Sequence, residues 1–234
     1  MDKKLTTINL SIICPTLNEA GNLPLLIADL NLWPDDIELN IVDGGSKDLT
    51  VFISNLSGAN LLTTAEPNRG KQLSHGANSA KGEWLLFLHA DCRLHKNWSK
   101  AIMQIINQSQ NKQYGWFFDF RLKKTNIFFT ILQLAVYIRS YIFQRPYGDQ
   151  GLLISKQLYN EIGGYNDLYI MEDLDFVIRL GQKTKLKRIG IPLFTDHRKW
   201  QHTNILNQAL KNASFKARWQ KGEDTKLLAS EYYK

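Results

Sequence analysis

An apolar segment that stops abruptly at chemically active side chains lies within residues 83–93. The run from Trp84 to Leu88 has no polar residue, and His89 and Asp91 follow it directly. Such a run is typical of a strand buried on both faces of a parallel sheet. Ligands of open α/β sheets bind beyond the carboxyl ends of the strands, so we expect both side chains to project into that crevice. Asp91 is suited to hold a divalent cation that binds phosphates, or alternatively to cap the next helix.

Two earlier strand ends carry similar polar loops. Strands predicted at 9–14 and 37–42 run into the loops 15–19 and 43–48, which contain three carboxylates and a Gly-Gly pair among their residues. The glycines permit a tight turn and a close approach of the backbone to a ligand. Ser46 or Asp48 can cap the helix that follows. A pattern of strand, carboxylate and helix therefore repeats along this half of the chain.

The predicted elements that position these loops alternate in type. Besides those above, they are helices at 23–32, from 49, and at 72–80, and strands at 60–64 and 84–88. Later elements are helices at 98–108, 156–162, 174–181 and 204–232, and strands at 115–122, 152–155 and 185–189. The alternation predicts an α/β fold with a mostly parallel sheet flanked by helices and a helical C-terminal tail. The absence of repeats or linkers favours a single domain, 1–234.

The segment from Ile127 to Phe143 is the most apolar of the later elements. It contains Gln133, Arg139 and Ser140 and is shorter than an uninterrupted membrane span of ~20 apolar residues. We therefore predict an amphipathic helix that packs mainly into the core. Contact with a bilayer and cover for an active site are the alternatives.

The composition favours an ordinary folded protein with an anionic partner. The 234 residues are 44% hydrophobic and 22% charged, with a net charge of +7. Nucleic acid is an unfavoured partner, because no helix-turn-helix, zinc or RRM signature is present and the basic residues are not strongly clustered. Two cysteines without paired spacing, and an N-terminus without signal-peptide features, predict a cytoplasmic protein with free thiols.

Three motifs in order carry a resemblance to a known family: Pro15-Thr16-Leu17-Asn18-Glu19, Val42-Asp43-Gly44-Gly45-Ser46-Lys47-Asp48-Leu49-Thr50 and Leu88-His89-Ala90-Asp91. The chain resembles the family 2 glycosyltransferases with the GT-A fold. The likeness covers about 11–200 and extends through Gly148-Asp149-Gln150-Gly151, Gly163-Gly164-Tyr165, Met171-Glu172-Asp173 and Arg198-Lys199-Trp200. These later motifs look most like the arsenosugar-biosynthesis or radical-SAM/selenodomain-associated glycosyltransferases. The implied division is a nucleotide-binding half at about 8–95, an acceptor half at about 96–203 and a tail at about 204–234.

The resemblance implies a nucleoside-diphosphate sugar, of UDP or GDP, as donor. The implied donor-binding residues are Pro15, Leu17, Glu19, Asp43, Arg69, Lys71, Asp91, Asp149, Gln150, Arg198 and Trp200. A buried acceptor such as Asp43 can hydrogen-bond a base N–H, whereas its alternative role is to cap the turn. Arg69 and Lys71 are alternatively ordinary surface charges. Arg198 can bind phosphate in a bidentate manner.

Family members carry Asp-x-Asp where this chain has His89-Ala90-Asp91, and the last Asp binds the divalent metal. The implied ligands of Mg²⁺ or Mn²⁺ are Asp91 and, from a later motif, His197. Because these cations accept diphosphate oxygens and water beside one carboxylate, Asp91 is still suited to hold one. His89 is expected to pack or to form hydrogen bonds rather than to bind metal.

The implied chemistry is displacement at the anomeric carbon with inversion. Asp173 matches the family's catalytic base and Glu172 precedes it; both are alternatively ordinary first-turn acids of a helix. The acceptor is a hydroxyl of a small or lipid-linked molecule. A basic C-terminal helix suggests a peripheral contact at the inner face of the membrane. The alternatives are a nucleotidyltransferase, whose usual Gly-Gly-x-Gly-Thr-Arg signature is missing, and an inactive sugar-nucleotide-binding homologue, supported only by His89.

Overall fold

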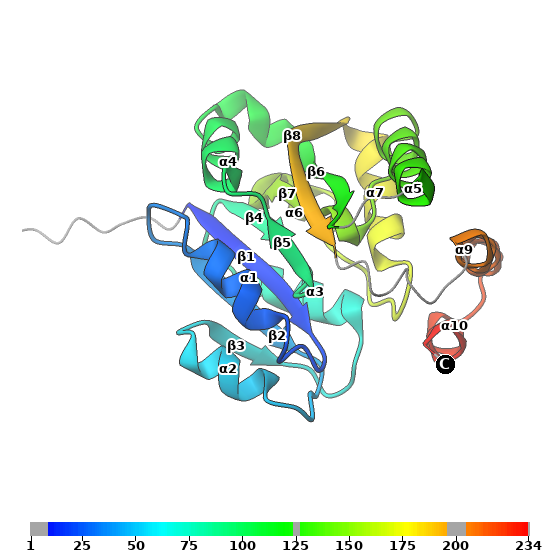
Figure 1. Ribbon diagram of the computed structural model, residues 1–234, viewed down its shortest axis with the longest axis horizontal. Helices are drawn as coiled ribbons and strands as arrows, with labels where there is room; N and C mark the ends of the chain where they lie inside the picture. The colour runs from blue at the N-terminus through cyan, green and yellow to red at the C-terminus, as the bar shows by residue number, and fades with distance from the viewer. Residues whose placement is uncertain (1–8, 124–126, 196–204, 234) are drawn as a thin grey trace, which may run out of the picture.

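The computed structural model describes residues 9–123, 127–195 and 205–233. Over these ranges the chain forms one eight-stranded mixed sheet in the order β3-β2-β1-β4-β7-β6-β8-β5, with helices packed around it (Figure 1). The strands are β1 (Leu10–Thr16), β2 (Glu38–Asp43), β3 (Asn60–Thr63), β4 (Trp84–Phe87), β5 (Cys92–Leu94), β6 (Gly115–Leu122), β7 (Leu152–Ser155) and β8 (Leu186–Thr195).

The helices connect and cover these strands. They are α1 (Leu23–Leu30), α2 (Thr50–Leu56), α3 (Arg69–Ser79), α4 (Trp98–Ile106), α5 (Ile127–Tyr137), α6 (Lys156–Glu161), α7 (Glu172–Lys183), α9 (Ile205–Gln220) and α10 (Thr225–Tyr232). Short 3₁₀ helices lie at η1 (Ser109–Gln113) and η3 (Gly148–Gln150), and α5 continues into a π-helical turn, η2 (Ile138–Ile142). The predicted α/β fold with a helical C-terminal piece is confirmed.

The strands at the centre of the sheet are buried on both faces, as the apolar run at 84–87 predicted. All of β4 is buried, and its side chains divide between two hydrophobic cores. Leu86 joins the core formed with α1 and α4, whereas Leu85 and Phe87 join the core formed with α3, α6 and α7. Ile12 and Ile13 of β1 divide in the same way, because successive side chains of a strand point to opposite faces.

The strand pairing brings many strand ends to one edge. Strands β1, β2, β3 and β4 are mutually parallel, and β7 runs antiparallel to β4, with Leu152 opposite Phe87. Strand β6 is antiparallel to β7 and parallel to β8, whereas β5 is antiparallel to β8, with Cys92 opposite Thr195. The carboxyl ends of β1, β2, β4, β6 and β8 therefore share an edge with the starts of β5 and β7. We call this the C-terminal edge.

Helix α5 and η2 lie on the surface, so the expectation that this segment packs mainly into the core is only half right. One face packs on β6, where Phe129 and Val136 contact Phe120 and Leu122. The other face is exposed along its length, from Ile127 to Phe143. Among the residues described, no helix is both long and apolar enough to cross a membrane.

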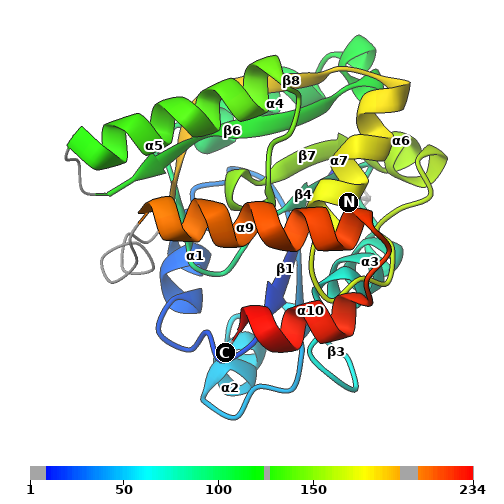
Figure 2. The ribbon, with the colours of Figure 1, turned by 90° about the vertical axis from the view of Figure 1, so that its right-hand side faces the viewer.

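The C-terminal helices α9 and α10 dock on the loop before α7. Phe215, Leu228 and Ala229 form a small core with Ile170 of that loop. Figures 1 and 2 show α5, α9 and α10 on the same side of the molecule, the side that faces the viewer in Figure 2. The basic tail predicted from the sequence is thus folded against the protein.

Gly70, at the start of α3, makes a close backbone contact with that same loop. A Cβ at this position would lie 2.7 Å from Leu168 N and 2.8 Å from Leu168 O, and closer still to Asn166 O. We expect Gly70→Ala to lower the free energy of unfolding by about 1–3 kcal/mol, because rigid backbone must move. Urea denaturation measures this. Gly21→Ala is the control, since nothing lies within 4 Å of the added carbon; an equal effect of both substitutions would contradict the packing argument.

Candidate functional site

The loops that follow β1 and β2 are joined to each other at the C-terminal edge. The N–H of Asn18 donates to Ser46 Oγ, and its side-chain oxygen accepts from the N–H of Lys47, both at 2.8 Å. The N–H of Glu19 donates to Thr50 Oγ1 at 2.8 Å. Thr16 lies opposite Asp43 in the strand register. The structure therefore brings together the loops that carry Pro15, Leu17, Glu19 and Asp43.

Asp43 is buried and its carboxylate organises the turn after β2. It accepts from the N–H groups of Gly45 at 2.9 Å and Ser46 at 2.8 Å, and from the hydroxyls of Ser46 at 2.5 Å and Thr16 at 3.2 Å. An ionised carboxylate has about four lone-pair sites, and these contacts use that capacity. The turn-cap role is thus the one its contacts display, and contact with a nucleotide base stays a prediction.

Gln72 on α3 fixes the ends of β1 and β2 side by side. Its amide nitrogen donates to Thr16 O at 2.9 Å and to Val42 O at 2.7 Å. The sequence reasoning did not select this residue. A glutamine on the otherwise small and apolar inner face of a helix, here beside Leu73 and Ala77, is the signal that would have found it.

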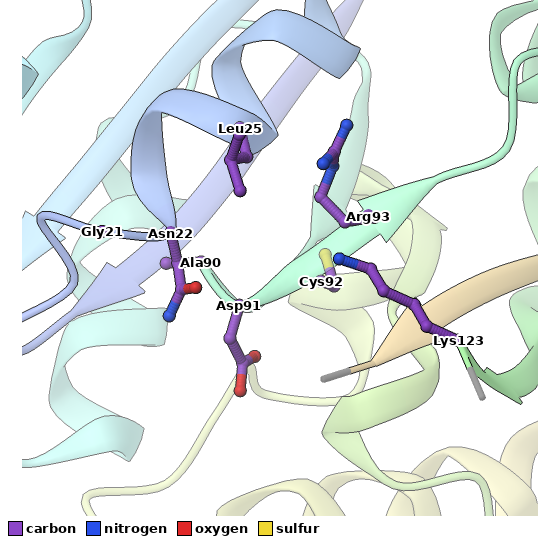
Figure 3. A pocket seen from close by; sticks show the side chains of 8 residues that line it. All are labelled: Gly21, Asn22, Leu25, Ala90, Asp91, Cys92, Arg93 and Lys123. Carbon is purple, nitrogen blue, oxygen red and sulfur yellow. The ribbon is translucent and has the colours of Figure 1, made fainter. Parts of the chain in front are cut away.

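Asp91 lines a small cavity between α1 and the start of β5 (Figure 3). The cavity has a volume of about 110 Å³, which is smaller than the roughly 300–1,000 Å³ of a typical ligand site and fits only part of a ligand. Its lining residues are Gly21, Asn22, Leu25, Ala90, Asp91, Cys92, Arg93 and Lys123. In Figure 3 the amide of Asn22 and the carboxylate of Asp91 point the same way, whereas Arg93 points away, toward its partner Asp29 at 2.7 Å. Neither Asn22 nor Lys123 was selected from the sequence.

Two buried cysteines, Cys14 of β1 and Cys92 of β5, lie near the carboxylate of Asp91. Burial raises the pKa of the Cys14 thiol, and the carboxylates of Glu19 and Asp91 raise it further. The pKa of Cys92 is raised by burial and then by Asp91. Both thiols are therefore held protonated and unreactive. Glu19 and Asp91 thus both lie close enough to Cys14 to act on its thiol.

Asp173 lies in the first turn of α7 and is held by two backbone donors. Its Oδ2 accepts from the N–H of Gly148 and its Oδ1 from the N–H of Leu174, both at 2.7 Å. Met171, just before the helix, has a left-handed backbone with φ of 67°, a conformation rare for non-glycine residues and frequent at functional sites.

Gly148 is also the meeting point of Asp173 and His89. A Cβ on Gly148 would lie 2.7 Å from His89 Nε2 and 3.5 Å from Asp173 Oδ2. The imidazole after β4 and the carboxylate that begins α7 thus approach the same point from two sides. Only glycine leaves room for both.

Glu172 differs from its neighbour, because its carboxylate is buried against Arg69. The residue is 1% exposed, and its Oε1 lies 3.3 Å from Arg69 Nη1. Burial raises the pKa of Glu172 to about 7, a shift that Arg69 opposes and Asp173 reinforces. Arg69 also donates to the hydroxyl of Tyr233 at 3.1 Å. Glu172 and Arg69 therefore join α3, α7 and the C-terminal tail. Lys71 instead pairs with Asp167 at the surface, at 3.3 Å.

The loop at η3 is tied to the π-helical turn of η2. The buried Gln150 amide accepts from Ser140 Oγ at 2.6 Å and Arg139 Nη2 at 3.1 Å, and donates to Phe118 O at 3.2 Å. The guanidinium of Arg139 stacks 3.6 Å above the ring of Tyr147 and lies 4.0 Å from the carboxylate of Asp149. The contacts of Gln150 hold the loop, and its role in binding the donor stays a prediction.

Sequence comparison decides the family. Residues 11–160 match the family described as Glycosyl transferase family 2. A PGL/p-HBAD biosynthesis glycosyltransferase of Mycobacterium bovis is 32% identical over 180 residues, which cover 72% of this chain and 68% of that protein. The chain belongs to glycosyl transferase family 2. It is a glycosyltransferase, and an uncharacterized glycosyltransferase of Haemophilus influenzae is 28% identical over 184 residues, 74% of this chain and 62% of that protein.

Solved structures share the fold of this glycosyltransferase. TarS 1–349 of S. aureus in complex with UDP-GlcNAc superposes with a TM-score of 0.65 and 16% identity, over 82% of this chain and 59% of that one. Glucosyl-3-phosphoglycerate synthase of Mycobacterium tuberculosis, in complex with Mg²⁺ and UDP, gives a TM-score of 0.59 and 15% identity, over 86% of this chain and 74% of that one. The arsenosugar subgroup stays a prediction.

The structure of the glycosyltransferase brings most of the predicted site residues to one edge. Asp43 ends β2, Asp91 lies between β4 and β5, and Asp173 lies in the first turn of α7. All three are at the C-terminal edge, as expected. His197, Arg198 and Trp200 lie outside the described residues. Within the described ranges, no three His, Cys, Asp or Glu side chains are grouped so as to hold a metal ion.

Glu172 predicts a pH dependence of stability. Its pKa is about 7 in the folded protein against an ordinary 4.5, so the folded state binds more protons between these values. The contribution of Glu172 is therefore fully present below pH ~4.5 and is lost as the pH rises through ~7. We expect wild type to lose about 1–3 kcal/mol relative to Glu172→Gln between pH 5 and pH 8, measured by chemical denaturation. A difference between the two proteins that stays constant over this range would refute the assignment.

Proposed function

We propose that this glycosyltransferase moves a sugar from a nucleoside-diphosphate sugar to an acceptor hydroxyl, with inversion and with help from a divalent cation. One observation carries the proposal. The Asp173 carboxylate is held by two backbone N–H groups at the C-terminal edge, next to His89 and on the same edge as Asp91. A fixed carboxylate at this place can accept a proton from an acceptor hydroxyl.

Asp173 has the properties of a general base. Each oxygen accepts one hydrogen bond from the backbone, which fixes its orientation and leaves a further lone pair on each. Its side chain is only partly buried, so an acceptor can approach. A single base without a protein nucleophile fits direct displacement, which inverts the anomeric centre.

Glu172 and Gln150 are assigned to positioning. Glu172 points its buried carboxylate at Arg69, and Gln150 uses its amide to hold η3. Both therefore fix the backbone on either side of Asp173, because Gly148 at the start of η3 donates to that carboxylate. Arg69 acts with Glu172 rather than on the donor.

The nucleotide is proposed to lie over the joined loops at 15–19 and 43–46, in the half at about 8–95. Pro15 and Glu19 flank Leu17, whose side chain is 42% exposed and offers an apolar surface to a base. UDP is the nucleotide we propose, since the TarS and glucosyl-3-phosphoglycerate synthase structures contain UDP or UDP-GlcNAc. Asp149, Arg198 and Trp200 are proposed for the sugar and diphosphate, and Lys71 for the rim of the site.

Asp91 would hold the cation, together with His197. Mg²⁺ commonly binds through one or two carboxylates plus substrate phosphates, so the Asp91 carboxylate at its cavity fits such a cation. When bound, Mg²⁺ or Mn²⁺ neutralises charge on the departing nucleoside diphosphate. Lys123, at the same cavity, can add a positive charge there.

Donor binding is tested by calorimetry with UDP, with and without Mn²⁺. We expect Mn²⁺ to tighten UDP binding to wild type, and Asp91→Asn to lose most of this gain, because the carboxylate that would hold the cation is gone. Asp35→Asn, which removes one negative charge from an exposed loop, is the matched control. No binding of UDP or GDP under any condition would refute the donor assignment, and binding without turnover would favour the inactive-homologue alternative.

The catalytic role is tested with Asp173→Asn. The amide oxygen can still accept from Gly148, so we expect donor affinity within about twofold of wild type, while transfer falls by about 10²–10⁴-fold. The measurement is release of nucleoside diphosphate in the presence of aqueous or lipid extracts as acceptors. Wild-type turnover by this variant would remove Asp173 as the base.

A further inference from the structure

The outer side of α5 and η2 is a continuous apolar surface. We call it the α5 face; its members, each between 38% and 68% exposed, are Ile127, Phe128, Ile131, Leu134, Tyr137, Ile138, Tyr141, Ile142 and Phe143. The side that packs on the protein holds the polar Gln133 and Ser140 among its buried residues. The packed side also holds the apolar Phe129 and Val136, so the helix is apolar on both sides, whereas a usual surface helix is polar on its outer side. An exposed apolar surface of this extent marks an interaction site.

The segment that carries the α5 face has charges of one sign in its sequence. Residues 120–148 contain no Asp or Glu, whereas they contain Arg121, Lys123, Lys124, Arg139 and Arg145. Arg188 of the neighbouring strand β8 places its guanidinium 5.1 Å from the Tyr137 ring and 5.8 Å from the Tyr141 ring, and it is paired with Asp119 at 2.6 Å. Apolar and aromatic side chains bordered by cations suit the boundary between lipid tails and anionic headgroups.

We propose that the α5 face docks this protein on an anionic lipid bilayer, with the helix lying in the interface. The described helices do not cross a membrane, and α5 with η2 has the composition of a helix that lies along one. The basic tail is the weaker docking element, because its described residues expose three large apolar side chains against nine on the α5 face, and part of its charge is paired internally. Arg218 pairs with Glu223 and Glu231, and Lys226 pairs with Glu66.

A second copy of this chain fits the α5 face less well. A two-fold dimer brings the same surface of each copy together, so the cations of one copy would face those of the other. Like charges opposed across an interface disfavour association, whereas anionic headgroups are complementary to them. The charge pattern therefore selects the bilayer.

Docking through the α5 face would also place the reaction beside the lipid. Arg139 and Ser140 of η2 contact Gln150, and η3 begins with the Gly148 that holds Asp173. The helix in the interface is thus attached to the acceptor side of the site, which favours an acceptor anchored in the membrane. This last step rests on the proposed function, whereas bilayer docking does not.

Vesicle co-sedimentation tests the docking. The probes are vesicles of phosphatidylcholine alone and vesicles in which part of it is replaced by phosphatidylglycerol. We expect wild type to bind the anionic vesicles, to bind neutral ones more weakly, and to lose binding as salt rises. The triple variant Phe128→Ser, Ile131→Ser and Ile142→Ser should weaken binding by about tenfold or more, because three apolar groups no longer enter the interface.

A matched control exists on the helix α2, far from this face in Figure 1. Leu49, Phe52 and Leu56 are 65%, 59% and 72% exposed, and their replacement by Ser should leave vesicle binding unchanged. UDP calorimetry on each variant checks folding and separates failure of docking from failure of the proposed function. Absence of wild-type binding to anionic vesicles, or equal losses in the two triple variants, would overturn the proposal. A different result would make a second copy the occupant of the α5 face. In that case wild type would not bind vesicles and would form a dimer in sedimentation velocity, and the triple variant at Phe128, Ile131 and Ile142 would not form this dimer.

Discussion

Burial of the central strands on both faces is the constraint on which the rest of the structure depends. Strand β4 is wholly buried, and β1 is buried over nearly all of its length, so chemically active side chains cannot lie along them at low cost. Polar groups are placed instead where the strands end. Because the strand pairing brings so many ends to the C-terminal edge, loops distant in sequence become neighbours there.

Carboxylates at this edge are the same chemical group in four environments. Asp43 is saturated by the donors of its own turn, and Glu172 is buried against a guanidinium. Asp173 is oriented by backbone N–H groups and is still accessible. Asp91 lines a cavity, and it and Glu19 both raise the pKa of Cys14. The described contacts of Asp43 and Glu172 stabilise the local fold, whereas Asp173 and Asp91 remain suited to chemistry, and the predicted role of each stays a prediction.

The sequence predicted what depends on local pattern. The strands at 115–122 and 152–155 have the predicted bounds, because runs of aromatic and branched residues end there at polar or turn residues. The sequence did not predict strand β5, because it has three residues and is defined by its pairing with β8, which is distant in the chain. The grouping of Asp43, Asp91 and Asp173 followed from placing each after a strand or before a helix. Whether a side chain such as Glu172 or Gln150 faces the cleft or the core depends on non-local packing, which a motif does not encode.

The polarity of α5 and η2 follows from what lies beneath them. The buried side must supply Ser140 and Arg139 to hold Gln150, so part of the inner surface is polar for a structural reason. The need to hold Gln150 explains the polar residues on the buried side of the helix. It does not explain the apolar residues on the exposed side, because polar residues there would make a helix that faces only water more soluble. The outer face therefore reflects a second requirement, and a helix meeting both connects an apolar outer surface with the loop that holds Asp173.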